Sequence, residues 1–331
     1  MNRREVISLL GGAAAWPLAA RAQQPAKIPR IGFLVTGSLE LPEARATLDA
    51  FQQGLRQLGY VEGRNIVIEH RAADGKIERF PSLAAELVRL NVDLIVAANT
   101  PAARAARQLT ATIPIVSVVM GDPVEDGLVA SLARPGGNVT GLTFLAPELT
   151  AKRLQLLKDA LPNVSRVAAL WHPGAFGERT TSDMVKATEA VARTLGVQLQ
   201  LLDVQGAEEF DRAFATMVRE RAEALLTFPG SLFFNERRRL VELAVTHRLP
   251  SIYAAREFVE LGGLIAYGAN INDLFRRSAV YVDGVLKGAK PADLPVEQAT
   301  RFELVINLKA AKDLGIDVPL PLMIRADEMI E

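Results

Sequence analysis

The feature that most constrains the fold is a regular alternation of short apolar runs with longer segments of helical period. Ten apolar runs are bounded by turn residues: Ile31–Val35, Ile66–Glu69, Leu94–Ala97, Ile115–Val119, Val139–Phe144, Val167–Trp171, Leu199–Val204, Ala224–Phe228, Ser251–Ala254 and Leu264–Tyr267. Most are apolar throughout, as expected of strands buried on both faces of a parallel sheet. Amphipathic segments separate them, at about 42–58, 78–90, 101–109, 147–160, 179–195, 208–221, 233–247 and 273–288. This alternation predicts right-handed crossovers and a doubly wound α/β architecture.

The number of predicted strands favours two lobes over one. The alternation continues across more than 230 residues, and one open sheet rarely holds so many strands. We place the division near residue 145, where Pro147 precedes a new helical segment, so that two similar halves face each other across a cleft. A closed eight-fold barrel is the main alternative. The apolar run Phe302–Ile306, which returns after the last long helix, favours two lobes.

The first 22 residues have the layout of a cleaved export signal. Arg3 and Arg4 precede an apolar run, Val6–Ala20, and the small-residue pattern Ala20-Arg21-Ala22 follows. Such a layout is typical of secretory signals, and the run is too short to anchor a chain in a bilayer. The paired arginines suit the twin-arginine route, but the residues after them depart from the fuller motif, so the route stays open. We therefore expect a periplasmic protein.

Composition excludes several classes of protein. The chain has 38 basic and 38 acidic side chains, and the predicted signal contains three of the basic and one of the acidic ones. The mature chain therefore has 35 basic and 37 acidic side chains and a net charge of −2. This balance attracts neither nucleic acid nor an anionic membrane surface. The chain has no cysteine, which excludes thiol catalysis, thiolate metal sites and a lipid-modified cysteine. No apolar stretch beyond the signal reaches transmembrane length, so we expect no direct membrane insertion.

Polar side chains follow several predicted strands, at the edge where ligands bind in open parallel sheets. Thr36 and Ser38 follow the first strand, Asn99 and Thr100 the third, and Asp122 the fourth. Thr100 before Pro101 fits a helix cap, and a capped helix start also presents N–H groups to an anion such as a carboxylate. Asp122 fits either of two roles, accepting a ligand amine or capping the turn that begins at Val124.

The second half offers mainly rings at the corresponding positions. His172, Phe228, Tyr253 and Tyr267 stand at the ends of predicted strands, where each suits either a stacking surface for a ligand or the edge of the core.

The signs of catalysis are weak. The three histidines of the chain lack metal-ligand spacing, and neither a Gly-x-Ser-x-Gly elbow nor a Walker loop is present. We therefore expect a binding protein, not an enzyme, with no metal and no cofactor.

Several longer motifs carry a family resemblance. They are G-D-P-V at 121–124, G-L-V at 127–129, R-P-G-G-N-V-T-G at 134–141, R-E-F-V at 256–259, G-G-L at 262–264, Y-V-D at 281–283, K-G-A-K-P-A-D-L-P-V-E at 287–297 and F-E-L-V-I-N at 302–307. Spread over essentially the whole mature chain, they resemble the signature of ABC-transporter substrate-binding proteins, in the group related to tryptophan- and tyrosine-type amino-acid binders.

The resemblance implies a type I periplasmic binding fold, in which three crossovers join two α/β lobes. On this sequence the crossovers fall near 145, 270 and 298. The first lobe would then comprise 28–144 plus 271–297, and the second 145–270 plus 298–331. Function would follow from hinge closure on a small solute, after which the closed form docks on an ABC permease in the inner membrane. No bond is made or broken, and we expect a monomer.

The resemblance also implies which residues contact the solute. Those expected from the first lobe are Thr36, Ser38, Asn99, Thr100 and Asp122, and those from the second are His172, Phe228, Tyr253 and Tyr267. An amino acid suits them, with its carboxylate at hydroxyls and helix N–H groups, its amine at Asp122 and its side chain against the rings. Because the first lobe has few aromatic residues, a branched-chain amino acid or an aromatic acid without an amine is an alternative. So is a sensory module that presents the solute to a membrane receptor.

Overall fold

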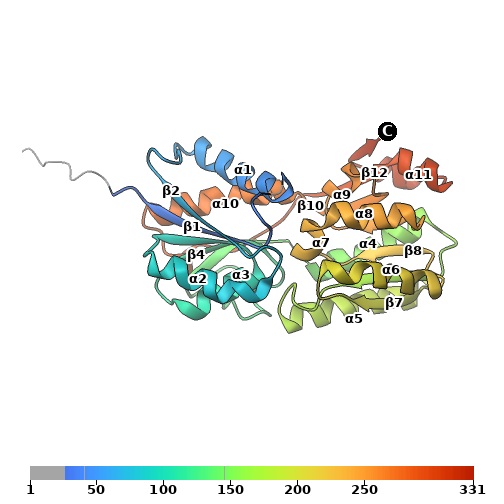
Figure 1. Cartoon of the computed structure of the whole chain (residues 1–331), viewed down its shortest axis with the longest axis horizontal. Helices are drawn as coiled ribbons and strands as arrows, with labels where there is room; N and C mark the ends of the chain where they lie inside the picture. Colours follow the sequence, from blue (N-terminus) through green and yellow to red (C-terminus); the bar gives the residue numbers. More distant parts are fainter. Residues whose placement is uncertain (1–26, 41, 145) are drawn as a thin grey trace, which may run out of the picture.

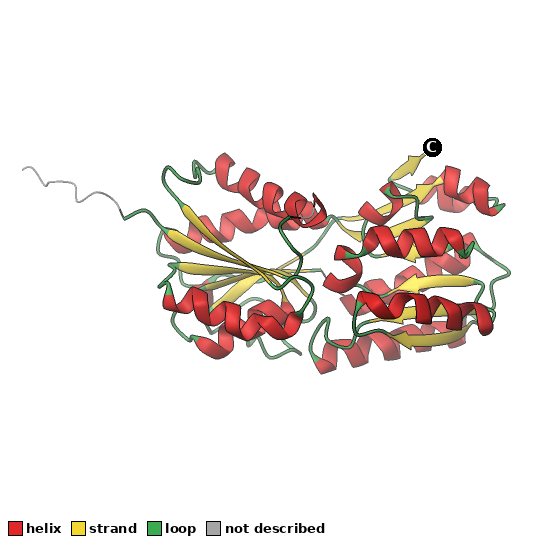
Figure 2. Ribbon diagram, viewed as in Figure 1, coloured by secondary structure: helices red, strands yellow, loops and turns green. Residues whose placement is uncertain are grey.

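The protein consists of two α/β lobes that lie side by side (Figure 1). The structure is a computed structural model and describes residues 27–331 apart from positions 41 and 145, so the predicted signal peptide at 1–22 lies outside the described residues. Figure 2 shows a separate sheet in each lobe with helices on both of its faces. The predicted doubly wound α/β architecture is confirmed, and the closed barrel is wrong because the strands form two open sheets.

The first sheet has six strands in the order β11-β5-β4-β3-β1-β2, all parallel. Its strands are β1 (Arg30–Val35), β2 (Val67–Ala72), β3 (Leu94–Asn99), β4 (Ile115–Met120), β5 (Val139–Thr143) and β11 (Glu297–Gln298). The helices packed on it are α1 (Pro42–Gln57), α2 (Phe80–Arg89), α3 (Thr100–Leu109) and α10 (Ile271–Leu286). Alternate strand residues point to α1 and α10 on one face and to α2 and α3 on the other, as the two-residue period of a strand requires.

The second sheet has seven strands in the order β13-β12-β10-β9-β8-β6-β7. Its strands are β6 (Arg166–Trp171), β7 (Gln198–Asp203), β8 (Ala224–Thr227), β9 (Ser251–Tyr253), β10 (Ile265–Ala269), β12 (Phe302–Asn307) and β13 (Glu328–Ile330). The pairing is parallel except between β10 and β12. The helices on one face are α4 (Ala146–Ala160), α5 (Glu178–Thr194), α11 (Leu308–Leu314) and α12 (Leu320–Arg325). Those on the other are α6 (Phe210–Arg219), α7 (Ser231–Asn235), α8 (Arg237–Thr246) and α9 (Glu257–Glu260).

The chain passes between the two sheets three times. It leaves the first sheet after β5, returns through α10 after β10, and leaves again between β11 and β12. The last passage explains the antiparallel strand, because β12 enters the second sheet from the side of the first lobe, where the parallel strands of that sheet end.

A glycine fixes α10 to the first lobe although α10 lies more than 200 residues after α1. A Cβ atom at Gly54 of α1 would stand 2.1 Å from the carbonyl oxygen of Arg276 in α10, so only glycine allows the two helices to approach this closely. Beyond the end of α1, the Tyr60 hydroxyl donates to Asp283 of α10 at 3.0 Å. The helix therefore belongs to the first lobe by packing.

Each of the ten apolar runs forms a strand, and Phe302–Ile306 forms β12. The helical segments also appear, with one difference: 233–247 is interrupted at Glu236, whose backbone leaves the helical region, and forms α7 and α8. Elements not predicted are β11, β13, α9, α11, α12 and the 3₁₀ turns at Ile77–Arg79, Ala207–Glu209 and Pro291–Asp293. Among the described helices, none has the length and apolar character needed to cross a membrane.

Candidate functional site

A cavity lies between the two lobes, and both contribute to its lining. Its volume is about 100 Å³. From the first lobe come residues at the ends of β1, β3, β4 and β5 and at the start of α10, namely Val35, Thr36, Gly37, Ala98, Asn99, Val119, Phe144, Ile271 and Phe275. The second lobe contributes residues after β6, β8 and β9, among them Ala175, Phe176, Phe228, Ser231, Phe233, Phe234, Asn235, Ala254 and Phe258. The carboxyl ends of parallel strands thus face each other, which is where such sheets bind ligands.

Phenylalanine dominates this lining. Of the chain's 13 phenylalanines, seven border the cavity: Phe144, Phe176, Phe228, Phe233, Phe234, Phe258 and Phe275. Two of them meet across the lobes, because the rings of Phe144 and Phe176 lie 5.9 Å apart between centroids. Phe234 and Phe258 form an edge-on pair at 6.5 Å. An aromatic surface of this kind takes up an apolar, ring-containing group.

The polar part of the cavity centres on Asn99. Its side-chain oxygen accepts from the Ala102 backbone N–H at 3.0 Å and so caps α3. Its amide nitrogen donates to the Thr36 hydroxyl at 2.6 Å and to the Ser231 hydroxyl at 2.8 Å. Ser231 belongs to the second lobe, so this amide joins the lobes across the cavity.

We expect Asn99→Ala to lower the free energy of unfolding by about 1 kcal/mol, because it removes an N-cap. Ser231→Ala keeps the cap and removes only the bond between lobes, so its effect should stay below about 0.5 kcal/mol. Urea denaturation of both variants and the unaltered protein measures the difference. Equal losses in the two variants would contradict a capping role for Asn99.

A second set of contacts joins the lobes where the loop after β4 meets the start of α5. The Thr180 hydroxyl donates to Asp126 Oδ1 at 2.8 Å and accepts from the Asp122 backbone N–H at 3.4 Å. Arg179 and Glu125 form an ion pair at 3.2 Å. Burial raises the pKa of the Asp126 carboxyl, and the bond from Thr180 offsets this only in part. Together with the Asn99–Ser231 bond, these contacts indicate that the lobes are closed on each other.

Three of the nine residues proposed to contact a solute border the cavity: Thr36, Asn99 and Phe228. His172 borders an adjoining cavity of about 40 Å³ that Thr36 and Ser231 share, and its Nδ1 lies 2.9 Å from the Val204 carbonyl oxygen. Ser38 is half-buried and accepts from the Glu40 N–H at 3.4 Å. Thr100 is fully buried at the start of α3 and accepts from the Gly121 N–H.

The remaining three are not in the lining of the cavity. Asp122 Oδ1 accepts from the backbone N–H groups of Val124 and Glu125, both at 3.0 Å, which is the capping role. Tyr253 is fully buried and stacks on Phe258 with centroids 4.5 Å apart. Tyr267 packs near Phe302, and its carbonyl oxygen accepts from Arg153 Nε at 2.6 Å.

Arg153 is the largest wholly buried side chain among the described residues. Burial lowers the pKa of its guanidinium group to about 9. Besides Tyr267, it donates to the Thr150 hydroxyl at 3.3 Å. The bond to Tyr267 connects α4 to β10, and the bond to Thr150 lies within α4.

Sequence reasoning missed most of the aromatic lining. Phe233 and Phe258 lie on helices whose approach to the cleft depends on tertiary packing, and at helical spacing they resemble core residues. Phe144 ends a predicted strand on the cleft side, so its position carried a usable signal. Within the described ranges, no group of three or more histidine, cysteine or acidic side chains is arranged to hold a metal ion.

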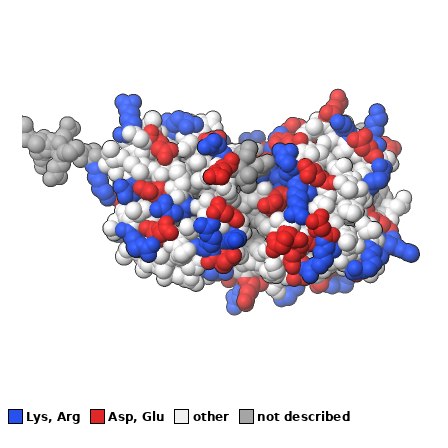
Figure 3. Space-filling view, viewed as in Figure 1, with Lys and Arg blue, Asp and Glu red and all other residues white. Residues whose placement is uncertain are grey.

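Charge on the outer surface is mixed. Figure 3 shows acidic and basic side chains interspersed on both lobes and a notch between the lobes at the upper edge. The chain as a whole has 38 basic and 38 acidic residues. The face shown therefore provides no extended field of one sign to attract a polyanion.

The chain is similar to known binding proteins over nearly its whole length. A family model described as ABC transporter substrate binding protein matches residues 34–330. A tyrosine-binding protein of Clostridioides difficile is 27% identical over 279 residues, which cover 84% of this chain and 79% of that protein.

Solved structures are also similar to this chain over nearly its whole length. The ABC domain from Streptococcus pneumoniae in complex with L-Trp superposes with a TM-score of 0.82 at 28% identity, covering 91% of this chain and 99% of that one. A conserved domain protein from Vibrio cholerae gives 0.83 at 28% identity, with 92% and 100% covered. A solute binding protein from Thermotoga lettingae, at 15% identity and a TM-score of 0.61, shares the fold.

Proposed function

Since the chain belongs to the family of ABC transporter substrate-binding proteins, whose model matches residues 34–330, we propose that it captures an aromatic amino acid in the periplasm for an ABC importer. A member of this family binds its substrate and is not an enzyme, as the sequence predicts. The proposal therefore concerns the solute, the motion and the partner.

The observation that carries the proposal is the aromatic cavity built from both lobes. Neither lobe alone encloses it, because Phe144 and Phe275 come from the first and Phe228 and Phe258 from the second. A solute held there gains both sets of contacts only when the lobes are closed, so its binding shifts the population to the closed form. Hinge closure follows from this differential affinity.

Two observations support an aromatic amino acid as the solute. Seven phenylalanines line the cavity, which favours a solute with a ring over a sugar or a polar amino acid. The similar proteins of known ligand are a tyrosine-binding protein and a domain in complex with L-Trp, at 27% and 28% identity. At this level of identity the amino acid bound by this chain can differ from those bound by the relatives. An amino acid of the same aromatic class suits the phenylalanine-lined cavity.

Delivery requires export and a docking partner. We propose that residues 1–22 direct export, that the mature chain is a monomer, and that its closed form docks on an inner-membrane permease. We propose that the lobes are 28–144 plus 271–297 and 145–270 plus 298–331. The division into two sheets supports this proposal, although Gln298 still pairs with Thr143 of the first sheet. The three passages of the chain between the sheets would form the hinge.

A thermal-shift screen tests the proposal. Residues 23–331 are refolded to remove any bound solute and then melted with L-tryptophan, L-tyrosine, L-leucine, indole-3-propionate or glucose. A ligand at about 1,000 times its dissociation constant adds about 4 kcal/mol to the stability, which should raise the midpoint by roughly 8–16 °C in a protein of this size. We expect this shift with an aromatic amino acid and none with glucose. No shift with any amino acid would refute the proposal.

A further inference from the structure

Three buried polar atoms, on α7, α9 and α10, have no hydrogen-bond partner. They are Asn235 Nδ2, Glu257 Oε2 and Asn272 Oδ1. Buried polar groups in folded proteins are nearly always paired, so orphaned atoms of this kind need an explanation. One explanation is a ligand that supplies the missing partners.

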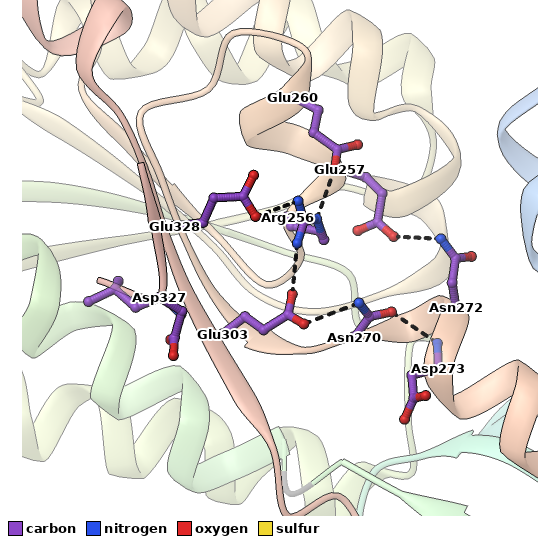
Figure 4. Close-up of polar contacts among 10 residues, drawn as sticks. Arg256, Glu257, Glu260, Asn270, Asn272, Asp273, Glu303, Asp327 and Glu328 are labelled. Atoms are coloured by element: carbon purple, nitrogen blue, oxygen red, sulfur yellow. Dashed lines mark hydrogen bonds and ion pairs between the residues drawn. The ribbon is translucent and has the colours of Figure 1, made fainter. Parts of the chain in front are cut away.

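One of these residues borders the cavity, and each of the other two is the chain neighbour of a residue that borders it. Asn235 borders the cavity itself, Glu257 directly precedes Phe258, and Asn272 directly follows Ile271, both of which border it. Asn272 Nδ2 donates to Glu257 Oε1 at 3.3 Å. Figure 4 shows the two side chains pointing toward each other, Glu257 from α9 and Asn272 from α10. The pair therefore joins the second lobe to the helix that packs on the first.

Glu257 is a carboxyl group held away from water, since only 9% of the residue is exposed. Burial raises the pKa of this carboxyl, against the hydrogen bond of its own backbone N–H and the attraction of Arg237 and Arg256, and with the repulsion of Glu260. The guanidinium of Arg256 is engaged elsewhere, with Glu260, Glu303 and Glu328 (Figure 4). Arg237 lies over the ring of Phe234 at 4.5 Å and donates to its carbonyl oxygen at 2.6 Å. Glu257 Oε2 is left without a donor.

The chemistry of the orphaned atoms identifies their partner. Glu257 Oε2 and Asn272 Oδ1 are both acceptors, and a protonated primary amine supplies three N–H donors and a positive charge. An ammonium–carboxylate bond is also stronger than a neutral one. The amide of Asn235, a donor, suits an acceptor oxygen of the same solute.

We propose that Glu257, with Asn272, recognises the primary ammonium group of the solute. This rests on the proposed function and assigns the amine to a residue other than Asp122, whose Oδ1 already accepts from two backbone N–H groups. Glu257 thus distinguishes an amino acid from the corresponding acid without an amine.

Isothermal titration of the mature chain with L-tryptophan and with indole-3-propionate, which lacks only the amine, tests the assignment. The unaltered protein should bind L-tryptophan at least tenfold more tightly. Glu257→Gln keeps the size of the side chain and should weaken L-tryptophan binding by tenfold or more, while indole-3-propionate binding changes less than twofold. Glu260→Gln is the matched control, because it removes a carboxylate from the same helix and should leave both affinities unchanged.

The outcomes separate this inference from the proposed function. Equal L-tryptophan affinity in Glu257→Gln and the unaltered protein would overturn the role of Glu257 and leave amino-acid capture intact. A tenfold loss in Asp122→Asn with none in Glu257→Gln would assign the amine to Asp122 instead. If Glu257→Gln fails to fold, equal affinities of the unaltered protein for the two solutes would overturn the inference alone. The absence of binding to any amino acid would overturn the proposed function as well.

Discussion

Replacing Phe33 by alanine is expected to lower the free energy of unfolding by about 3–5 kcal/mol, the usual cost of truncating a buried phenylalanine. Phe33 lies in β1 and has no exposed surface. Its ring stacks on Phe51 of α1 at 5.2 Å and meets Phe275 of α10 at 6.2 Å. The change would therefore open a cavity where three elements meet, one of them supplied by the returning chain.

Urea denaturation followed by tryptophan fluorescence and by circular dichroism measures this loss. Val280→Ala is the control, because Val280 lies on the same helix α10 but is 60% exposed, and such surface changes usually cost no more than about 0.5 kcal/mol. A loss below about 1 kcal/mol for Phe33→Ala would contradict a packed centre at this point. We do not expect Phe33→Ala to weaken the free energy of ligand binding by more than it lowers the free energy of unfolding.

Most of the strands could be predicted because they are buried on both faces, as β3 and β8 are throughout. Runs such as Leu94–Ala97 and Val167–Trp171 are apolar throughout, and in a parallel sheet no solvent-facing side imposes polar residues. The strands that could not be predicted are short. β11 has two residues and β13 has three, and neither is long enough to show a period.

The interrupted helix at 233–247 shows a limit of periodicity. Its apolar residues keep helical spacing through Glu236, where the structure leaves the helix, and the buried Arg237 begins α8. Nothing local in this segment, neither proline nor glycine, marks the break. Both α7 and α8 pack on the same second-lobe core, so the break does not separate them into different parts of the fold.

For the site, the sequence predicts where a strand ends but not where the next side chain points. Thr36, Asn99 and Phe228 follow strands and do border the cavity. Asp122 follows a strand equally well, yet its carboxylate turns back to cap its own loop. Tyr253 stacks within the second lobe. Strand order fixes the position of the backbone, whereas local hydrogen bonds and packing decide the direction of each side chain.

Residues on helices were harder to predict for a related reason. Phe275 lies on α10 and borders the cavity only because the chain crosses back to the first lobe, whereas Glu257 lies on α9 and pairs with Asn272 of α10. Phe275 has the helical spacing of a core residue and does pack against Phe33. Glu257 is an acidic residue in an ordinary helical turn, and only its burial distinguishes it. Burial of this kind is a property of the folded chain.

Gly121→Val is expected to weaken binding of an aromatic amino acid at least 100-fold, about 2.7 kcal/mol. Gly121 follows β4 in the first lobe, and a Cβ atom there would lie 2.8 Å from the Phe176 ring and 2.9 Å from the Thr180 methyl group, both in the second lobe. Its backbone does not require glycine, because its φ is not positive. Valine therefore obstructs closure, not folding of the first lobe. If it reduces the closed population of the free protein about 100-fold, the apparent affinity falls by the same factor.

Gly137→Val is the matched control, because a Cβ at that position would meet nothing within 4 Å. Isothermal titration gives the two affinities, and small-angle scattering with and without the solute reports closure. Gly121→Val should keep the larger radius of gyration when the solute is added, and the control should contract. Binding within threefold of the unaltered protein would show that the solute is held by one lobe alone. A 100-fold loss with an unchanged melting point of the empty protein would instead tie affinity to closure, because the three atoms nearest to the added Cβ all belong to the opposite lobe.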